Sequence, residues 1–200
     1  QDLSAQPRQI PVVDAALLLI DAQASFINGL WAAPLARGEV VPLAVAFTNA
    51  AQLLRSLPSL PRLLTRCPFP PGDYDWAPAL AGVLPEDEVY VIKPANDVLW
   101  PPTNGAIGAL DAMVGSGLRH LVIGGGTLTS CVRISALSLV ERYKDRLSVT
   151  VDLSISGARG QNYQSTSVGD QIFKGASPVA KGVTDMQAAG IWVAPYTDWL

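Results

Sequence analysis

The sequence predicts an α/β protein: a single, three-layer, doubly wound domain with a mostly parallel sheet of about six strands and helices on both faces. Three observations support this prediction. Short apolar, β-rich segments recur along the chain, and segments with helical spacing of apolar residues lie between them. The strand segments are apolar throughout, which is typical of strands covered on both sides. The chain has 200 residues, enough to bury a substantial core, so we expect one domain over residues 1–200 with a polar N-terminal arm at residues 1–12.

Six apolar runs are the expected strands. The first is Ala15–Ile20, which ends directly before Asp21. The other five lie at residues 63–65, 89–92, 121–123, 147–151 and 191–193. The first has the length of a buried strand, and none approaches the roughly 18 apolar residues that a membrane-spanning helix needs.

Helices are expected at residues 41–54, 106–114 and 132–143, where apolar residues recur at helical spacing. Two segments are expected to be long loops. Residues 68–78 are rich in Pro and Gly, and residues 157–181 are polar and rich in Ser and Gly. Loops of this length are candidates for the walls or the lid of a pocket.

Composition excludes some classes of function. The formal net charge is −3, so we expect no basic surface for nucleic acid. The mean hydropathy of +0.27 is high, but no run is long enough to cross a membrane. Two cysteines are too few for a disulfide framework, and the first residues do not resemble a signal peptide, so a cytoplasmic protein is expected.

Reactive side chains follow four of the expected strands. Asp21 ends the first, Cys67 follows the second, and Lys93 ends the third, while three glycines at 124–126 lead from the fourth toward Cys131. In an open parallel sheet the ligand site lies at the carboxyl ends of the strands. Asp21, Lys93 and Cys131 are therefore expected at one edge of the sheet.

Cys131 is a candidate nucleophile. The residues before it indicate a strand, a tight turn and the start of a helix, with Thr129 or Ser130 as a possible cap. A cysteine in the first turn of a helix lies at the positive end of the helix dipole, which favours the thiolate. Nearby N–H groups could stabilise an oxyanion formed on a substrate. From the residues alone, a buried structural cysteine is an equally good interpretation.

Asp21 and Lys93 shift this balance toward chemistry. A carboxylate directly after six apolar residues could take the thiol proton and later deliver it to a leaving amine. Lys93 could keep Asp21 ionised and stabilise the thiolate. Each residue alone also fits a simpler role: Asp21 as a helix cap or loop ligand, and Lys93 as a solvated lysine at the end of a strand.

Three separated motifs resemble those of the isochorismatase-like cysteine hydrolases. Residues 17–26 match the family's opening motif, an apolar strand followed by Asp, any residue, Gln and then Phe. Lys93 matches the family's lysine, and residues 125–132 match the glycine turn that leads to the nucleophile. The motifs keep the family's order over nearly the whole chain. The resemblance implies the isochorismatase-like, Rossmann-like version of the predicted fold.

The resemblance also implies roles for the three residues: Asp21 as general base and acid, Lys93 as its charged partner and Cys131 as the attacking thiolate. It implies a cis peptide bond at Gly126–Thr127, which would aim the Thr127 N–H, together with the Cys131 N–H, at the substrate oxygen. The implied reaction is hydrolysis of a small amide through a thioester.

Substrate contacts are expected from side chains near the same strand ends. The candidates are Gln23 and Phe26 after the first strand and Asn96 and Trp100 after Lys93. Trp31 and Trp100 fit the core or a subunit interface equally well. Members of the family usually assemble as dimers or tetramers, which implies a homodimer or homotetramer.

Neither a metal nor another cofactor is expected. Nicotinamidases of the family bind a metal through an Asp and two His near the second strand, but residues 65–73 contain no His, and Cys67 and Asp73 leave only a slight chance of a zinc site. His120, the only histidine, precedes the fourth strand and so belongs to the opposite edge. True isochorismatases lack the cysteine, so Cys131 favours cleavage of a C–N bond.

One alternative stays open. The chain could be a non-catalytic isochorismatase-like protein that binds a small molecule or a partner, because residues beside the implied pocket depart from the family pattern. Dinucleotide binding is excluded, since residues 124–126 lack the G-x-G-x-x-G spacing and no phosphate-binding loop occurs. The expected substrate is a small amide, carbamate or related acyl compound.

Overall fold

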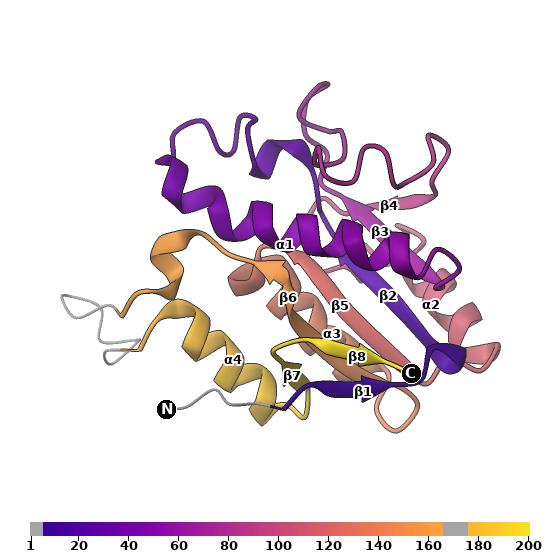
Figure 1. Cartoon of the computed structure of the whole chain (residues 1–200). Coiled ribbons are helices and arrows are strands. Elements are labelled where there is room, and N and C mark those ends of the chain that lie inside the picture. Colours follow the sequence, from indigo (N-terminus) through magenta and orange to yellow (C-terminus); the bar gives the residue numbers. More distant parts are fainter. Residues whose placement is uncertain (1–5, 166–175) are drawn as a thin grey trace.

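The computed structural model describes residues 6–165 and 176–200 and contains a central sheet of six parallel strands (Figure 1). The strand order is β4-β3-β2-β5-β6-β7. All five strand pairs are parallel. The strands are β2 (Ala15–Ile20), β3 (Arg62–Arg66), β4 (Tyr90–Ile92), β5 (His120–Gly126), β6 (Ser148–Gly157) and β7 (Trp192–Ala194). The predicted fold class is confirmed.

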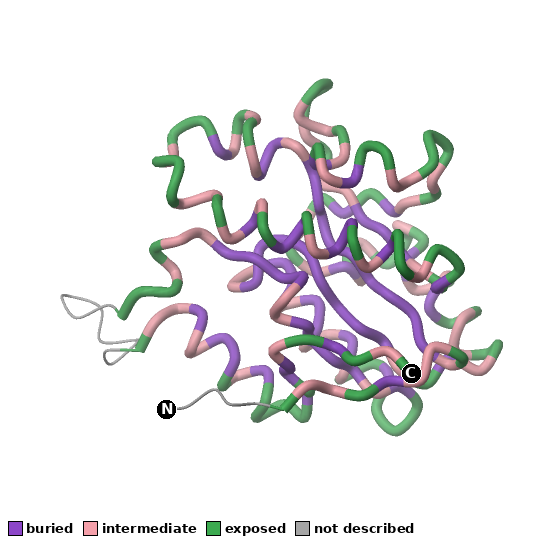
Figure 2. The backbone as a smooth tube through the Cα atoms, viewed as in Figure 1, coloured by how far each residue is buried: buried purple, intermediate pink, exposed green. Residues whose placement is uncertain are grey.

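Helices cover both faces of this sheet. On one face lies α1 (Arg37–Ser56), whose buried side chains form one hydrophobic cluster with the sheet. The other face is covered by α2 (Ala106–Gly115), α3 (Arg133–Arg142) and α4 (Pro178–Ala188), which form the second cluster. Figure 2 shows the resulting layers, with buried strands in the centre and exposed residues on the outer sides of the helices. Among the described helices, none is long and apolar enough to cross a membrane.

The alternation of side chains along β2 explains why this strand is apolar throughout. Leu17 and Leu19 pack into the cluster on the α1 side, and Leu18 and Ile20 pack into the cluster on the opposite side. All four are fully buried, and burial of such a side chain contributes about 1.5–3 kcal/mol. The strand that carries Asp21 is therefore anchored on both faces.

The three helices predicted from spacing and the six predicted strands are all present, with shifted ends. β6 continues to Gly157, beyond the predicted end at residue 151, because its register with β5 shifts and Ser156 and Gly157 pair with the glycines of β5. Residues 157–165 and 176–181 were expected in a loop, but Gly160–Tyr163 form a 3-10 turn and α4 begins at Pro178, capped by Ser177. The middle of that predicted loop, residues 166–175, lies outside the described residues.

The expected N-terminal arm contains a strand. β1 (Arg8–Ile10) pairs in parallel with β8 (Thr197–Trp199), so residues near the two ends of the chain form a separate two-stranded sheet. Ile10 is completely buried, which fixes this small sheet to the α1 side of the core. The N-terminal arm predicted at residues 1–12 therefore includes a strand that pairs with the other end of the chain.

Candidate active site

Asp21 follows the last residue of β2 at the carboxyl edge of the sheet, and its side chain is fully buried. Its φ angle is +48°, a conformation that costs a non-glycine residue about 1–3 kcal/mol and is concentrated at functional sites. Thr65 of the neighbouring strand stabilises it twice. The Asp21 N–H donates to Thr65 Oγ1 at 3.1 Å, and that hydroxyl donates to Asp21 Oδ1 at 2.6 Å.

Lys93 follows β4 and forms a buried ion pair with Asp21. Its Nζ lies 2.7 Å from Asp21 Oδ2, and neither side chain is exposed. The ammonium also donates to the carbonyl oxygen of Ala95 at 2.6 Å. Burial by itself lowers the pKa of Lys93, but the charges of Asp21 and the two nearby thiols outweigh burial and raise it above 10.5. Lys93 is therefore a fixed cation.

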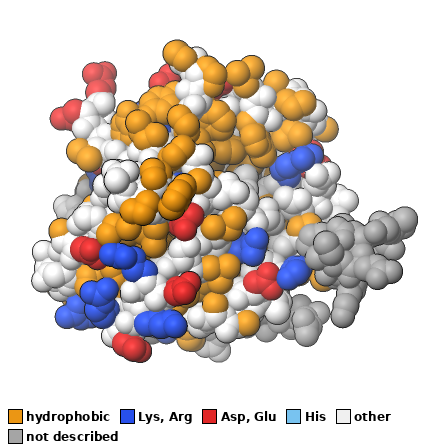
Figure 3. All heavy atoms as spheres, turned by 180° about the vertical axis from the view of Figure 1, so that it is seen from behind, with side chains coloured by type: hydrophobic (Ala, Val, Ile, Leu, Met, Phe, Trp, Pro, Cys, Tyr) orange, Lys and Arg blue, Asp and Glu red, His pale blue; other side chains and the backbone are white. Residues whose placement is uncertain are grey.

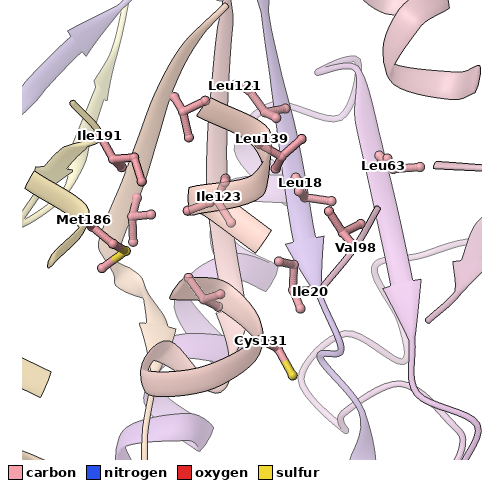
Figure 4. Packing of buried hydrophobic residues seen from close by; sticks show 14 of the residues in the cluster. Leu18, Ile20, Leu63, Val98, Leu121, Ile123, Cys131, Leu139, Met186 and Ile191 are labelled. Atoms are coloured by element: carbon pink, nitrogen blue, oxygen red, sulfur yellow. The ribbon is translucent and has the colours of Figure 1, made fainter. Parts of the chain in front are cut away.

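Cys131 lies in a π-helical turn, Leu128–Val132, between β5 and α3. Figure 4 shows it at the margin of the apolar cluster, below Ile20, with its sulfur pointing away from Met186 and Ile191. It is 6% exposed, and its thiol donates to Asn96 Oδ1 at 3.4 Å. Lys93 and Asp21 both act electrostatically on this thiol, so the three predicted catalytic residues meet at one place.

The resting state of Cys131 differs from the expectation of a thiolate. Burial raises the pKa of the thiol above 9.0; the Lys93 charge lowers it, and the Asp21 carboxylate raises it. The helix dipole was expected to favour the anion, but the turn here is a single π turn, and desolvation outweighs its effect. The free protein therefore holds Cys131 as a thiol, which needs a base before it can attack.

The predicted helix caps take other roles. Thr129 Oγ1 accepts a hydrogen bond from the Asn162 amide at 3.3 Å, and the Ser130 hydroxyl is 2.6 Å from Thr127 Oγ1. The turn is closed by backbone bonds instead, because the N–H groups of Ser130 and Val132 both donate to the Thr127 carbonyl. The Gly126–Thr127 peptide bond is cis, at the position that the resemblance implies.

Cys67 belongs to the site, although it was not among the predicted site residues. It follows β3, and its thiol donates to Asp21 Oδ2 at 3.1 Å. A signal was present in the sequence, since Thr65 and Cys67 are two residues apart and extended chain places such residues on one face. Asp73, which was considered with Cys67 as a zinc ligand, instead accepts a hydrogen bond from the Leu30 N–H.

Gln23 is a contact within the chain and not the expected substrate contact. Its side-chain amide donates to the carbonyl oxygens of Cys67 and Tyr74, both at 3.0 Å, and its Oε1 accepts from the Cys67 N–H at 2.7 Å. Gln23 is completely buried. Both amide N–H groups are used in these bonds, which hold the end of β3 beside Asp21.

The other predicted substrate contacts have different surroundings. Phe26 is buried and packs edge-on against Trp31 and Phe69, so it belongs to the core. Trp100 is 58% exposed. Asn96 is also exposed, and it contacts the Cys131 thiol directly. Of the four candidates, Asn96 has the position of a group that a ligand at Cys131 would meet.

His120 lies at the opposite edge of the sheet, as predicted. It begins β5 and pairs with Ala15 and Ser148, the first residues of their strands. Among the described residues, no group of three His, Cys, Asp or Glu side chains is placed to hold a metal ion.

Comparisons with known proteins bear on the fold. An isochorismatase from Pseudomonas putida KT2440 superposes with a TM-score of 0.66 at 18% identity, over 94% of this chain and 90% of that one. The fold is that of the isochorismatase-like hydrolases. YcaC from Escherichia coli, an octameric hydrolase of unknown specificity, gives a TM-score of 0.60 at 23% identity, over 94% of this chain and 77% of that one. YcaC from Pseudomonas aeruginosa, solved with hexane-2,5-diol and covalent acrylamide, gives a TM-score of 0.58 at 22% identity, over 92% of this chain and 77% of that one. No protein-family model matches the sequence, and no curated protein is significantly similar to it.

Proposed function

We propose that the chain is an isochorismatase-like cysteine hydrolase that cleaves an amide-type C–N bond of a small molecule through a thioester. The observation that carries the proposal is the buried Asp21–Lys93 pair, 2.7 Å between Oδ2 and Nζ, within electrostatic range of the Cys131 thiol. A buried ion pair costs desolvation energy, so its position beside a nucleophile favours a catalytic role.

In the first half of the reaction Asp21 takes the proton of the Cys131 thiol, and the thiolate attacks the substrate carbonyl carbon. The C–N bond then breaks, the carbonyl is restored as a thioester, and Asp21 gives its proton to the departing amine or ammonia. A base is needed here because burial raises the pKa of Cys131.

In the second half a water molecule attacks the thioester and loses its proton to Asp21. The C–S bond breaks, the carboxylic acid product leaves, and the proton on Asp21 returns to the sulfur of Cys131. Lys93 keeps its charge throughout, because the pKa of this residue lies above 10.5. It thereby stabilises each anionic state of Asp21 and Cys131.

The N–H groups of Thr127 and Cys131 are proposed to bind the oxyanion of the tetrahedral intermediate. Support comes from the turn itself, which is held by two hydrogen bonds to the Thr127 carbonyl. Donors fixed in this way need no reorganisation when the charge develops.

We also propose that the protein acts as a homo-oligomer, with a dimer or tetramer as the expected size. Figure 3 shows hydrophobic side chains gathered over one part of the molecular surface. Val89 and Ile92, beside and in the edge strand β4, are 81% and 49% exposed. Large exposed apolar areas are typical of protein–protein contacts. YcaC of E. coli, which has this fold, is an octamer.

A second candidate function is binding of a small molecule without catalysis. The side chains of Asp21 and Lys93 are not exposed and Cys131 is 6% exposed, so the triad is nearly closed to solvent in the chain alone. Catalysis requires the substrate to displace the exposed Asn96 from the thiol, whereas a binding protein needs no such opening.

Release of ammonia or amine from a panel of small amides and carbamates tests the proposal. We expect turnover by the wild type and a loss of at least about 10³-fold in Cys131→Ala and in Asp21→Asn. Exhaustive chelation should leave the rate unchanged, because residues 65–73 contain no histidine. Lys181→Met serves as a control, since it removes a surface ion pair. Near-normal turnover in Cys131→Ala would sink the mechanism, and loss of activity on chelation with recovery in zinc would contradict its metal independence.

A further inference from the structure

Cys67 lies inside the site, yet the proposed reaction gives it no step. It is the other of the two cysteines in the chain, besides Cys131, and its thiol donates to the same carboxylate that acts as the base. A cysteine that only fills space would not need to contact the base.

Three donors share the two oxygens of Asp21. Thr65 Oγ1 binds Oδ1 at 2.6 Å, while Lys93 Nζ and Cys67 Sγ bind Oδ2 at 2.7 Å and 3.1 Å. Thr65 and Cys67 come from the same strand end and approach from the β3 side. Removal of Cys67 would leave one oxygen with only the lysine.

The backbone of Cys67 is held by two hydrogen bonds with the side chain of Gln23. Gln23 accepts from the Cys67 N–H at 2.7 Å and donates to the Cys67 carbonyl at 3.0 Å. Gln23 is two residues after Asp21, so the segment that carries the base also holds the residue that binds it. This arrangement explains why the buried amide of Gln23 points at the chain and not at a ligand.

Cys67 stays protonated over the working range of pH. Burial, followed by the charge of Asp21, raises the pKa of this thiol far above 9.0. The thiol is therefore a hydrogen-bond donor to Asp21 and not a competing nucleophile.

We propose that Cys67 is a positioning residue of the hydrolase: its thiol orients the Asp21 carboxylate and offsets part of the carboxylate's charge beside Cys131. The inference rests on the proposed function and deepens it. A thiol is a weak donor, so it holds the carboxylate while leaving Oδ2 able to exchange a proton.

The charges around Cys131 predict the direction in which loss of Cys67 changes the pKa of the Cys131 thiol. The ionisable groups acting on its thiol are Asp21 after β2 and Lys93 after β4. Cys131 in turn raises the pKa of Cys67, which follows β3. The Asp21 carboxylate raises the pKa of Cys131. Without the Cys67 donor that carboxylate is less neutralised, so the pKa of Cys131 must rise further.

The test is the pH dependence of Cys131 alkylation by iodoacetamide, located by peptide mapping, in wild type, Cys67→Val and Cys67→Ser. Valine removes the donor but fills the space, and serine keeps a donor. We expect the alkylation midpoint of Cys67→Val to rise by at least about half a pH unit, with Cys67→Ser close to wild type. With an amide that the wild type hydrolyses, kcat of Cys67→Val should fall about 10-fold while KM stays within about threefold of the wild-type value. Cys67→Ser should retain most of the wild-type kcat.

An unchanged midpoint in Cys67→Val would overturn the proposal. So would an equal loss of kcat in the valine and serine variants without any shift, because that pattern reports packing. Cys67→Ala replaces the valine variant if thermal unfolding shows that valine prevents folding. Alkylation needs no substrate, so a shifted midpoint without turnover of any amide would support the role of Cys67 and count against the hydrolase itself.

Discussion

At the scale of single residues, Asp21 is defined by the groups that contact it. Its carboxylate is fully buried. It accepts hydrogen bonds from Thr65 and Cys67 and forms an ion pair with Lys93. A buried charge is tolerated only when it is paired and hydrogen-bonded. The site is thus stable as a unit, and each member depends on the others.

Lys93→Met tests that dependence. Loss of the cation leaves the Asp21 charge unpaired in the interior, so we expect the free energy of unfolding to fall by about 3–5 kcal/mol. The measurement is urea denaturation followed by circular dichroism. Lys181→Met is the matched control: its lysine pairs with Asp185 at the surface, and the expected cost is below about 1 kcal/mol.

The double variant Asp21→Asn/Lys93→Met completes a thermodynamic cycle. Removal of both charges should cost clearly less than the sum of the two single variants. Additive losses would show that the pair is not coupled, in conflict with the 2.7 Å contact.

The three catalytic candidates were predictable from the sequence because each follows a strand in a parallel sheet. The contacts of Thr65 and Cys67 with Asp21 were not predictable: the spacing places both side chains on one face of the strand, but which residues they meet depends on the register of β3 with β2. That register, Leu18 beside Leu63, brings Thr65 and then Cys67 to Asp21. Gln23 was misassigned for a related reason: a glutamine in a motif does not show whether its amide faces a ligand or the chain.

At the scale of elements, the close contact of β5 with β2 sets the position of the nucleophile. Gly125 has a φ of +116°, and a side chain there would collide with the backbone of Ile20. The glycine is therefore required by both conformation and space. It allows β5 to end beside Asp21, so that the following turn presents Cys131 to the base.

Gly125→Ala is expected to reduce the free energy of unfolding by about 3 kcal/mol or more, through backbone strain and overpacking. Thermal and urea unfolding measure the loss. Gly108→Ala is the matched control, because Gly108 lies in the exposed part of α2 with open space at its Cβ position. That change should stabilise by about 0.5–1 kcal/mol. Similar stability of the two variants would refute the close contact of β5 and β2.

The loop at residues 68–78, predicted as a candidate wall or lid of a pocket, is anchored by contacts with Arg66 of β3. The Arg66 guanidinium lies 3.9 Å from the ring centre of Trp76 and 5.0 Å from that of Tyr74. Tyr90 of β4 adds a third ring at 4.3 Å. A cation among aromatic rings ties the loop to two strands.

At the scale of the whole molecule, the sheet and its layers follow from apolar runs and helical spacing. Those signals are local, and they predicted the six strands of the central sheet and three of the four α-helices among the described residues. The pairing of β1 with β8 could not be predicted, because each strand has three residues and its partner is at the other end of the chain. α4 was hidden because its first residues continue a polar stretch rich in Ser and Gly.

The fold of the whole molecule does not identify the substrate. The compared structures share 18–23% of residues with this chain, and they carry the fold only. Asn96 lies beside the Cys131 thiol, and Trp100 lies on the exposed surface. A search for the substrate begins with these two residues.

Intact-mass spectrometry is the most direct test of the central claim, that Cys131 is a nucleophile activated by Asp21 and Lys93. The protein is incubated with a panel of small amides, and separately with acrylamide, which is found covalently bound in YcaC of Pseudomonas aeruginosa. We predict one acyl or acrylamide adduct per chain in the wild type, mapped to Cys131 and absent from a folded Cys131→Ala variant. No adduct from any compound, or an adduct mapped to Cys67, would contradict the claim and favour a binding protein without catalysis.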